Sequence, residues 1–224
     1  MTSLDIDMLR RALHEVADPD KAEPMAAYTK GHFVYMGVTA GDRRTVSKAL
    51  IRDVKHAQPD SLIALATELW DQPERELHYI AMDLLRAGAQ NLRPSDLDAV
   101  AGFITKTPWW DTVDSLAAWT VGPMVTNYPE LVRTMDRWID GDDLWLARTA
   151  ILHQLGFKDR TDAARLFSYA ERRAADTDFF IRKAIGWALR QYARVDPDAV
   201  RLFVAEHADE LSGLTKREAL KHLS

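Results

Sequence analysis

The sequence predicts an all-α protein, an α-solenoid of HEAT-like helical repeats that forms a concave groove. Almost every segment has the amphipathic period of a helix, and no alternating run is long enough for a β-sheet. A related helical segment also recurs every 35 residues. Because no linker rich in Gly, Ser or Pro divides the chain, residues 1–224 are predicted to form a single domain.

The amphipathic stretches follow one another along the chain, with prolines and glycines such as Pro59, Pro94 and Gly141 at the breaks. Asp162 directly precedes an apolar run, where an N-cap residue is expected. The predicted helices span 4–17, 43–56, 59–70, 74–88, 94–105, 109–126, 129–140, 143–156, 161–174, 178–194, 197–208 and 215–223.

The repeat aligns four segments through Arg75, Trp110, Trp145 and Phe180, each 35 residues after the last. Each segment is the second helix of a pair, and paired helices at this period indicate a solenoid. The tetratricopeptide signature is missing, so HEAT-like repeats fit better. Second helices of a solenoid share one concave face, so functional side chains on them are expected to share one groove.

Composition narrows the function classes. The chain has no cysteine, which excludes disulfides and a thiol nucleophile. The seven histidines are scattered, and glycine-rich phosphate loops and GxSxG are absent, so we expect no metal and no cofactor. No apolar run suits a membrane helix and the N-terminus does not resemble a signal peptide, so we expect a cytoplasmic protein with no membrane partner.

The net charge of −5 hides a basic segment. Residues 148–194 contain ten Lys and Arg against five Asp and Glu, a local charge of +5. Such a patch suits a polyanion even on an acidic protein.

The stretch TPWWDTVDSL (107–116) places two tryptophans beside aspartates. On a helix, Trp109 falls on the apolar stripe together with Trp119, whereas Trp110 and Asp114 are neighbours on another face. An aromatic plate beside a carboxylate suits a cationic ligand or a developing positive charge. The alternative is that Trp110 packs on the next helix and Asp114 pairs with a cation there.

A second aromatic residue lies among cations. Lys183, Trp187, Arg190 and Arg194 share one helix face, opposite the apolar stripe. Basic side chains around an aromatic plate suit phosphate contacts with stacking. The alternative is a second apolar face that packs on the C-terminal helix.

Further cations complete the candidate groove. Arg148 holds the repeat position of Lys183, and it either extends into the groove or pairs with a buried acid. Arg43 and Arg44 begin an N-terminal helix with Lys48 one turn later, which suggests a cluster that contacts a phosphate backbone. The alternative, which is favoured, is an ordinary exposed basic cluster, since such pairs are common on protein surfaces.

Six ordered blocks resemble the DNA alkylation repair glycosylases of the AlkD type, which are HEAT-like solenoids. The resemblance covers nearly the whole chain. The blocks span 21–33, 68–76, 107–115, 144–155, 179–193 and 214–222.

The resemblance implies a monofunctional DNA glycosylase that hydrolyses the N-glycosidic bond of cationic N3- and N7-alkylated purines, such as 3-methyladenine and 7-methylguanine, in duplex DNA. It implies that Asp114 is catalytic, that Trp110 and Trp187 flank it, and that Arg148 lies in the groove with Tyr28 near the lesion strand. We expect a monomer.

Two other functions compete with this one. A non-catalytic HEAT-repeat protein could bind distorted or branched DNA, and many α-solenoids are protein-binding scaffolds. The tryptophan and aspartate set favours the enzyme, and the basic face favours DNA over a protein partner.

Overall fold

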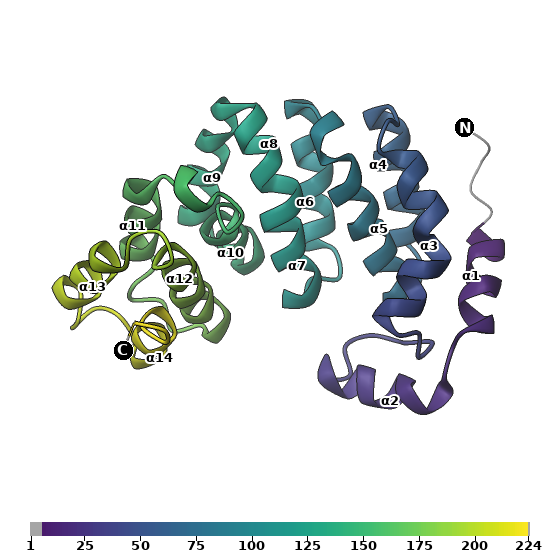
Figure 1. Ribbon diagram of the computed structural model, residues 1–224, viewed down its shortest axis with the longest axis horizontal. Coiled ribbons are helices and arrows are strands. Elements are labelled where there is room, and N and C mark those ends of the chain that lie inside the picture. Colours follow the sequence, from purple (N-terminus) through teal and green to yellow (C-terminus); the bar gives the residue numbers. More distant parts are fainter. Residues whose placement is uncertain (1–5, 224) are drawn as a thin grey trace. The chain divides into compact units, whose positions relative to one another are not determined.

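The computed structural model describes residues 6–223 and is helical throughout (Figure 1). Within these residues, β-type pairing is limited to one isolated bridge between Val34 and Glu74. The predicted all-α class with helical repeats is therefore confirmed. The contacts group the chain into two compact units, Met1–Ala99 and Val100–Ser224. In a repeat array each helix pair contacts mainly its neighbours, so even a single domain can divide into two such units. The single domain therefore stays a prediction.

In the first unit, α3 and α4 both pack on α5, and α1 packs on α3. The facing surfaces are aliphatic, and Leu69 of α4 and Leu84 of α5 are fully buried. The predicted start of the first helix at residue 4 lies outside the described residues. The elements are α1 (Ile6–Glu15), α2 (Pro19–Tyr28), α3 (Ala40–Val54), α4 (Pro59–Trp70), α5 (Arg75–Gly88), the short turns η1 (Ala89–Asn91) and η2 (Pro94–Asp96), and the start of α6 (Leu97–Thr105).

In the second unit, α10 packs on α7, α9 and α12, and α12 packs extensively on α14. The helices that bear the candidate site are therefore direct neighbours. The elements are the rest of α6, α7 (Trp110–Leu116), η3 (Ala117–Val121), α8 (Gly122–Asn127), η4 (Pro129–Leu131), α9 (Val132–Asp140), α10 (Leu144–Leu152), η5 (Lys158–Arg160), α11 (Ala163–Arg172), α12 (Phe179–Tyr192), α13 (Pro197–Glu206) and α14 (Gly213–Ala219).

The 35-residue register matches the start of each second helix. Arg75 and Trp110 are the first residues of α5 and α7, and Trp145 and Phe180 are the second residues of α10 and α12. The repeat therefore marks equivalent positions in successive helix pairs, as predicted.

Two of these helices, α10 and α12, have an aspartate as their N-cap residue. Asp143 accepts hydrogen bonds from the backbone N–H groups of the first turn of α10, and Asp178 does the same for α12. A side-chain acceptor at the N-cap satisfies donors that the helix itself leaves without partners. The caps thus fix where the site-bearing helices begin.

Two helix starts in the first unit differ from the prediction. The helix α2 was missed because it contains Pro19 and Pro24 and none of its residues is buried, so it has little apolar period. Its start suits proline, which favours the first helical turn after an N-cap, here Asp18. The helix α3 begins at Ala40 rather than 43, because Thr39 accepts a hydrogen bond from the backbone of its first turn.

A π-helical turn interrupts the helix predicted over 109–126. In η3 the Gly122 N–H donates to the carbonyl of Ala117, five residues earlier. Pro123 has no N–H to donate to the helical ladder, and π-helical structure occurs mostly as single turns inside α-helices. The wider turn rotates the following side chains, and Trp119 is 41% exposed. The placement of Trp119 on the apolar stripe was therefore wrong.

Candidate functional site

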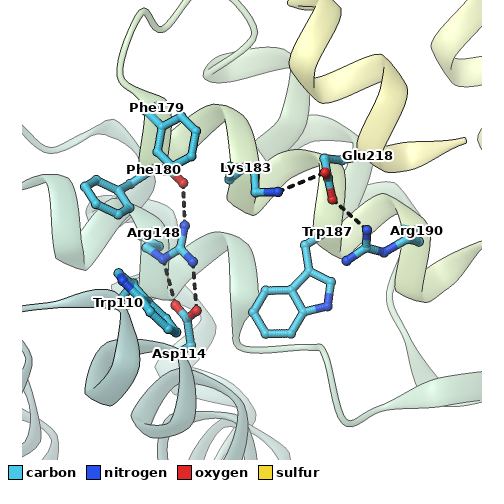
Figure 2. Close-up of a pocket in the computed structure, with 9 residues that line it drawn as sticks. All are labelled: Trp110, Asp114, Arg148, Phe179, Phe180, Lys183, Trp187, Arg190 and Glu218. Atoms are coloured by element: carbon cyan, nitrogen blue, oxygen red, sulfur yellow. Dashed lines mark hydrogen bonds and ion pairs between the residues drawn. The ribbon is translucent and has the colours of Figure 1, made fainter. Parts of the chain in front are cut away.

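A pocket of about 390 Å³ lies in the second unit between α7, α10, α12 and α14 (Figure 2). Three of its lining residues are the predicted catalytic set Asp114, Trp110 and Trp187. The pocket thus brings together side chains that lie more than seventy residues apart in the sequence.

At the floor of the pocket, Arg148 holds the Asp114 carboxylate with two parallel hydrogen bonds. The arginine Nε donates to Oδ1 over 2.7 Å and Nη2 donates to Oδ2 over 2.8 Å. The third guanidinium nitrogen, Nη1, donates to the Phe180 carbonyl. Of the two alternatives for Arg148, the structure shows pairing with a buried acid. The two parallel hydrogen bonds orient the carboxylate, and the Asp114 side chain remains 13% exposed.

Burial and ion pairing act on the Asp114 carboxyl in opposite directions. Burial raises its pKa, since the charged form loses solvation. The hydrogen bonds and charge of Arg148 lower the pKa again in part, and the nearby Asp111 raises it slightly. Arg148 is therefore the group that opposes the effect of burial on this pKa, and both carboxylate oxygens accept hydrogen bonds from it.

The two indoles lie on either side of the carboxylate in Figure 2. Trp110 is the first residue of α7, one turn before Asp114, and Trp187 comes from the middle of α12. Both side chains are half-buried and line the pocket. The predicted placement of Trp110 and Trp187 away from the apolar stripes of their helices thus agrees with the structure.

Three rings from successive repeats, including Phe180 of the pocket lining, form an aromatic cluster. Trp109 lies 5.2 Å from Phe180 and 6.0 Å from Trp145 between ring centroids, and Trp145 lies 5.1 Å from Phe180. Trp109 is the N-cap of α7 and is half-buried in this cluster. The cluster supports the Phe180 backbone, whose carbonyl binds Arg148.

The side chain of Glu218 on α14 pairs with two of the predicted phosphate-binding cations. Lys183 Nζ donates to Glu218 Oε1 over 2.8 Å, and Arg190 Nη1 donates to Oε2 over 2.6 Å. These contacts, from Lys183 first, lower the pKa of the Glu218 carboxyl. Packing of α14 on this face was the alternative for Trp187, and it is present beside the pocket. Arg194 is exposed and is not among the residues that line it.

Acids outside residues 148–194 neutralise part of the positive charge that was counted within this segment. Arg165 pairs with Asp136 over 2.5 Å, and Arg172 pairs with Asp140. Both acids belong to α9, outside the segment that was summed. A charge count over a sequence window omits such partners, so the patch is weaker than +5 suggests.

In the first unit, Arg43 departs from the predicted cluster. It is only 7% exposed, its Nη2 lies 3.2 Å from Asp83 Oδ2, and its guanidinium stacks 4.8 Å from the Tyr79 ring centroid. Its helical position turns it toward α5, so it is not part of an exposed cationic surface.

Arg44 and Lys48 are exposed, as predicted, and line a groove of about 950 Å³ between α3 and α5. Arg52, Lys55 and Arg86 contribute further cations to the same groove. The sequence analysis missed these three because they are spread over two helices.

Tyr28, the last residue of α2, is 69% exposed. It lines a separate pocket of about 380 Å³ with Tyr35 and Tyr79, whose hydroxyls are 3.0 Å apart. Aromatic plates of this kind offer stacking surface.

Two general features of residues 6–223 bear on the function. No group of three or more His, Asp or Glu side chains in this range is arranged to hold a metal ion. Nor does any helix in the range combine the length and apolar character that crossing a membrane requires.

A family model described as DNA alkylation repair enzyme matches residues 9–223. The chain belongs to the DNA alkylation repair enzyme family. This confirms the resemblance found in the six sequence blocks. It also places the protein in DNA repair, with DNA as its partner.

Solved structures agree with this assignment. The predicted DNA alkylation repair enzyme from Enterococcus faecalis is 30% identical, with a TM-score of 0.86 over 93% of this chain and 97% of that chain. AlkD2 from Streptococcus mutans is 16% identical, with a TM-score of 0.64 over 90% and 98%. Smu.31 from Streptococcus mutans is 17% identical, with a TM-score of 0.62 over 79% and 90%. The latter two support the fold alone. No curated protein sequence matches the chain.

Proposed function

We propose that this member of the DNA alkylation repair enzyme family is a monofunctional DNA glycosylase. Its substrates are cationic N3- and N7-alkylated purines in duplex DNA. The observation that carries the proposal is the Asp114 carboxylate, held by Arg148 in a pocket between Trp110 and Trp187.

The chemistry needs a fixed anion more than an acid. When the bond from C1′ to the purine breaks, its electron pair goes to the base, which leaves as a neutral molecule. The sugar becomes an oxocarbenium-like cation, and water then adds to C1′ and releases a proton to solvent. The carboxylate of Asp114 stabilises this cation or orients the water, and a prepositioned charge in a partly dry site is worth several kcal/mol. Protonation of the leaving base is unnecessary.

The tryptophans complete the site for a cationic sugar. The faces of Trp110 and Trp187 carry negative electrostatic potential, which attracts a positive charge. They also exclude water from the carboxylate, which strengthens its effect.

The pocket favours hydrolysis without strand cleavage. Cleavage by a covalent imine requires a neutral amine, and the amine that lines the pocket is Lys183. Its Nζ donates to Glu218 Oε1 over 2.8 Å, so this amine is held in an ion pair rather than presented to C1′ of the sugar. The product is therefore an abasic site in an intact strand.

The exposed cations of the first unit provide contact with the DNA backbone. Arg44 and Lys48 lie one helical turn apart on the rim of the α3–α5 groove. They supply sequence-independent, salt-sensitive affinity, as phosphate contacts do.

The test is base release from a duplex with a single 7-methylguanine, with and without alkali treatment. We expect release of the base, strand cleavage only after alkali, and no release of a neutral lesion such as uracil. If the protein releases nothing from this duplex or from methylated genomic DNA but still binds duplex DNA, the non-catalytic DNA-binding function replaces the glycosylase.

A further inference from the structure

Glu218 is a second carboxylate in the pocket, and the α12–α14 packing fixes its position. The Thr215 hydroxyl donates to the Arg182 carbonyl over 3.1 Å. Gly186 faces α14 so closely that a Cβ there would lie 2.5 Å from the Cβ of Glu218. The absence of a side chain at Gly186 thus lets Glu218 approach α12, and the glutamate side chain is only 17% exposed.

The two partners of Glu218, Lys183 and Arg190, lie on α12 on either side of Trp187 in the sequence. Lys183, Trp187 and Arg190 are spaced i, i+4 and i+7, so they form one row on α12. Glu218 binds the first and last members of this row, one with each oxygen. In Figure 2 this bridge spans the row above the Trp187 ring.

We propose that Glu218 is a positioning residue of the glycosylase site, which neutralises Lys183 and Arg190 and holds them away from both the sugar and the DNA phosphates. This inference rests on the proposed function. Without Glu218, two cations would face the pocket in which the sugar becomes positive, and like charges oppose each other.

The charge balance predicts opposite effects on rate and on affinity. The pocket contains the carboxylates of Asp114 and Glu218 and the cations of Arg148, Lys183 and Arg190. Removing the Glu218 charge adds net positive charge, which disfavours the cationic transition state. The same change releases two cations for phosphate contacts and strengthens DNA binding. A purely structural residue would weaken both when replaced.

The experiment compares Glu218→Gln with the wild type and with Glu206→Gln, which removes one exposed acid from α13. Base release from 7-methylguanine DNA is measured under single-turnover conditions, and affinity for undamaged duplex is measured over a range of salt concentrations. We expect Glu218→Gln to release base about tenfold more slowly. Its affinity for undamaged duplex should be higher than that of the wild type. The slope of log affinity against log salt concentration should be steeper by about 1 to 2. Glu206→Gln should match the wild type.

A second variant separates charge from folding. Glu218→Gln combined with Lys183→Gln restores the original charge balance and should recover most of the rate. Loss of rate and affinity together in Glu218→Gln, with no recovery in the double variant, would overturn the inference. A wild type that releases no base defeats the proposed function instead, and the affinity and salt slope of Glu218→Gln then decide the inference by themselves.

Discussion

Replacing Arg148 with glutamine should remove the partner of a buried carboxylate and destabilise the protein. Breaking a buried ion pair by removing one side costs about 3 to 5 kcal/mol. The Phe180 carbonyl also loses its hydrogen bond from Arg148, which adds about 1 kcal/mol. Since Asp114 is 13% exposed and can take up a proton, we expect the lower end of this range, about 4 kcal/mol in total. For a chain of this size that corresponds to roughly 8 to 16 °C in Tm.

The loss should depend on pH through Asp114. Burial raises the pKa of this carboxyl and Arg148 opposes the rise, so Arg148→Gln raises the pKa further. A carboxyl whose pKa is raised by folding contributes stability at low pH, and this contribution disappears as pH rises through the folded-state pKa. The difference in Tm between wild type and variant should therefore be largest near neutral pH and shrink as Asp114 becomes protonated.

Thermal melts of both proteins from pH 8 down to acid conditions test this reasoning. The double variant Arg148→Gln, Asp114→Asn has no buried charge in the pair and should recover all but about 1 kcal/mol, the share of the Phe180 carbonyl. A Tm difference that is constant with pH, or a double variant no more stable than Arg148→Gln, would refute the account of the pair.

Three further predictions follow from separate features. Gly186→Ala should lower Tm by several degrees, measured by thermal melting, because its Cβ would lie 2.9 Å from the Thr215 carbonyl oxygen and overpacking costs about 1 to 3 kcal/mol. Arg44→Gln with Lys48→Gln should reduce the salt slope of duplex binding by about 2 and leave single-turnover release at saturating protein unchanged, as salt-titrated affinity and rate assays will show. Burial lowers the pKa of His153 to about 4, so its charging in the unfolded state should cost about 2 kcal/mol of stability between pH 7 and 5. Denaturant titrations should show this loss in the wild type and not in His153→Gln.

The sequence predicted the elements whose causes are local or periodic. The 35-residue recurrence located the second helices, because the four aligned residues lie at the starts of α5, α7, α10 and α12. The face of α12 that bears Trp187 was predicted correctly because that helix is regular over four turns. Trp110 and Asp114 were paired correctly for the same reason, since they lie within the regular part of α7.

The features that the sequence analysis missed depend on contacts between distant segments or on irregular backbone. The placement of Trp119 failed at a π-helical turn, where helical periodicity no longer applies. Arg43 was expected on the surface, but Asp83 and Tyr79 on another helix bind it. Glu218 was missed because only the docking of α14 on α12 brings it to the pocket. Contacts between residues on different helices cannot be predicted from the residue spacing within one helix.

We propose that the Asp114 carboxylate acts on the chemistry rather than on DNA binding, in addition to its pairing with Arg148. This claim is tested most directly by single-turnover release of 7-methylguanine and duplex affinity for Asp114→Asn. Asp136→Asn is the control for loss of an aspartate charge, because it breaks a more exposed aspartate–arginine pair in the same unit outside the pocket. We predict at least a hundredfold slower release for Asp114→Asn with unchanged affinity, and near wild-type release for Asp136→Asn. Equal loss of release and affinity in Asp114→Asn, or equal slowing in both variants, would contradict the claim.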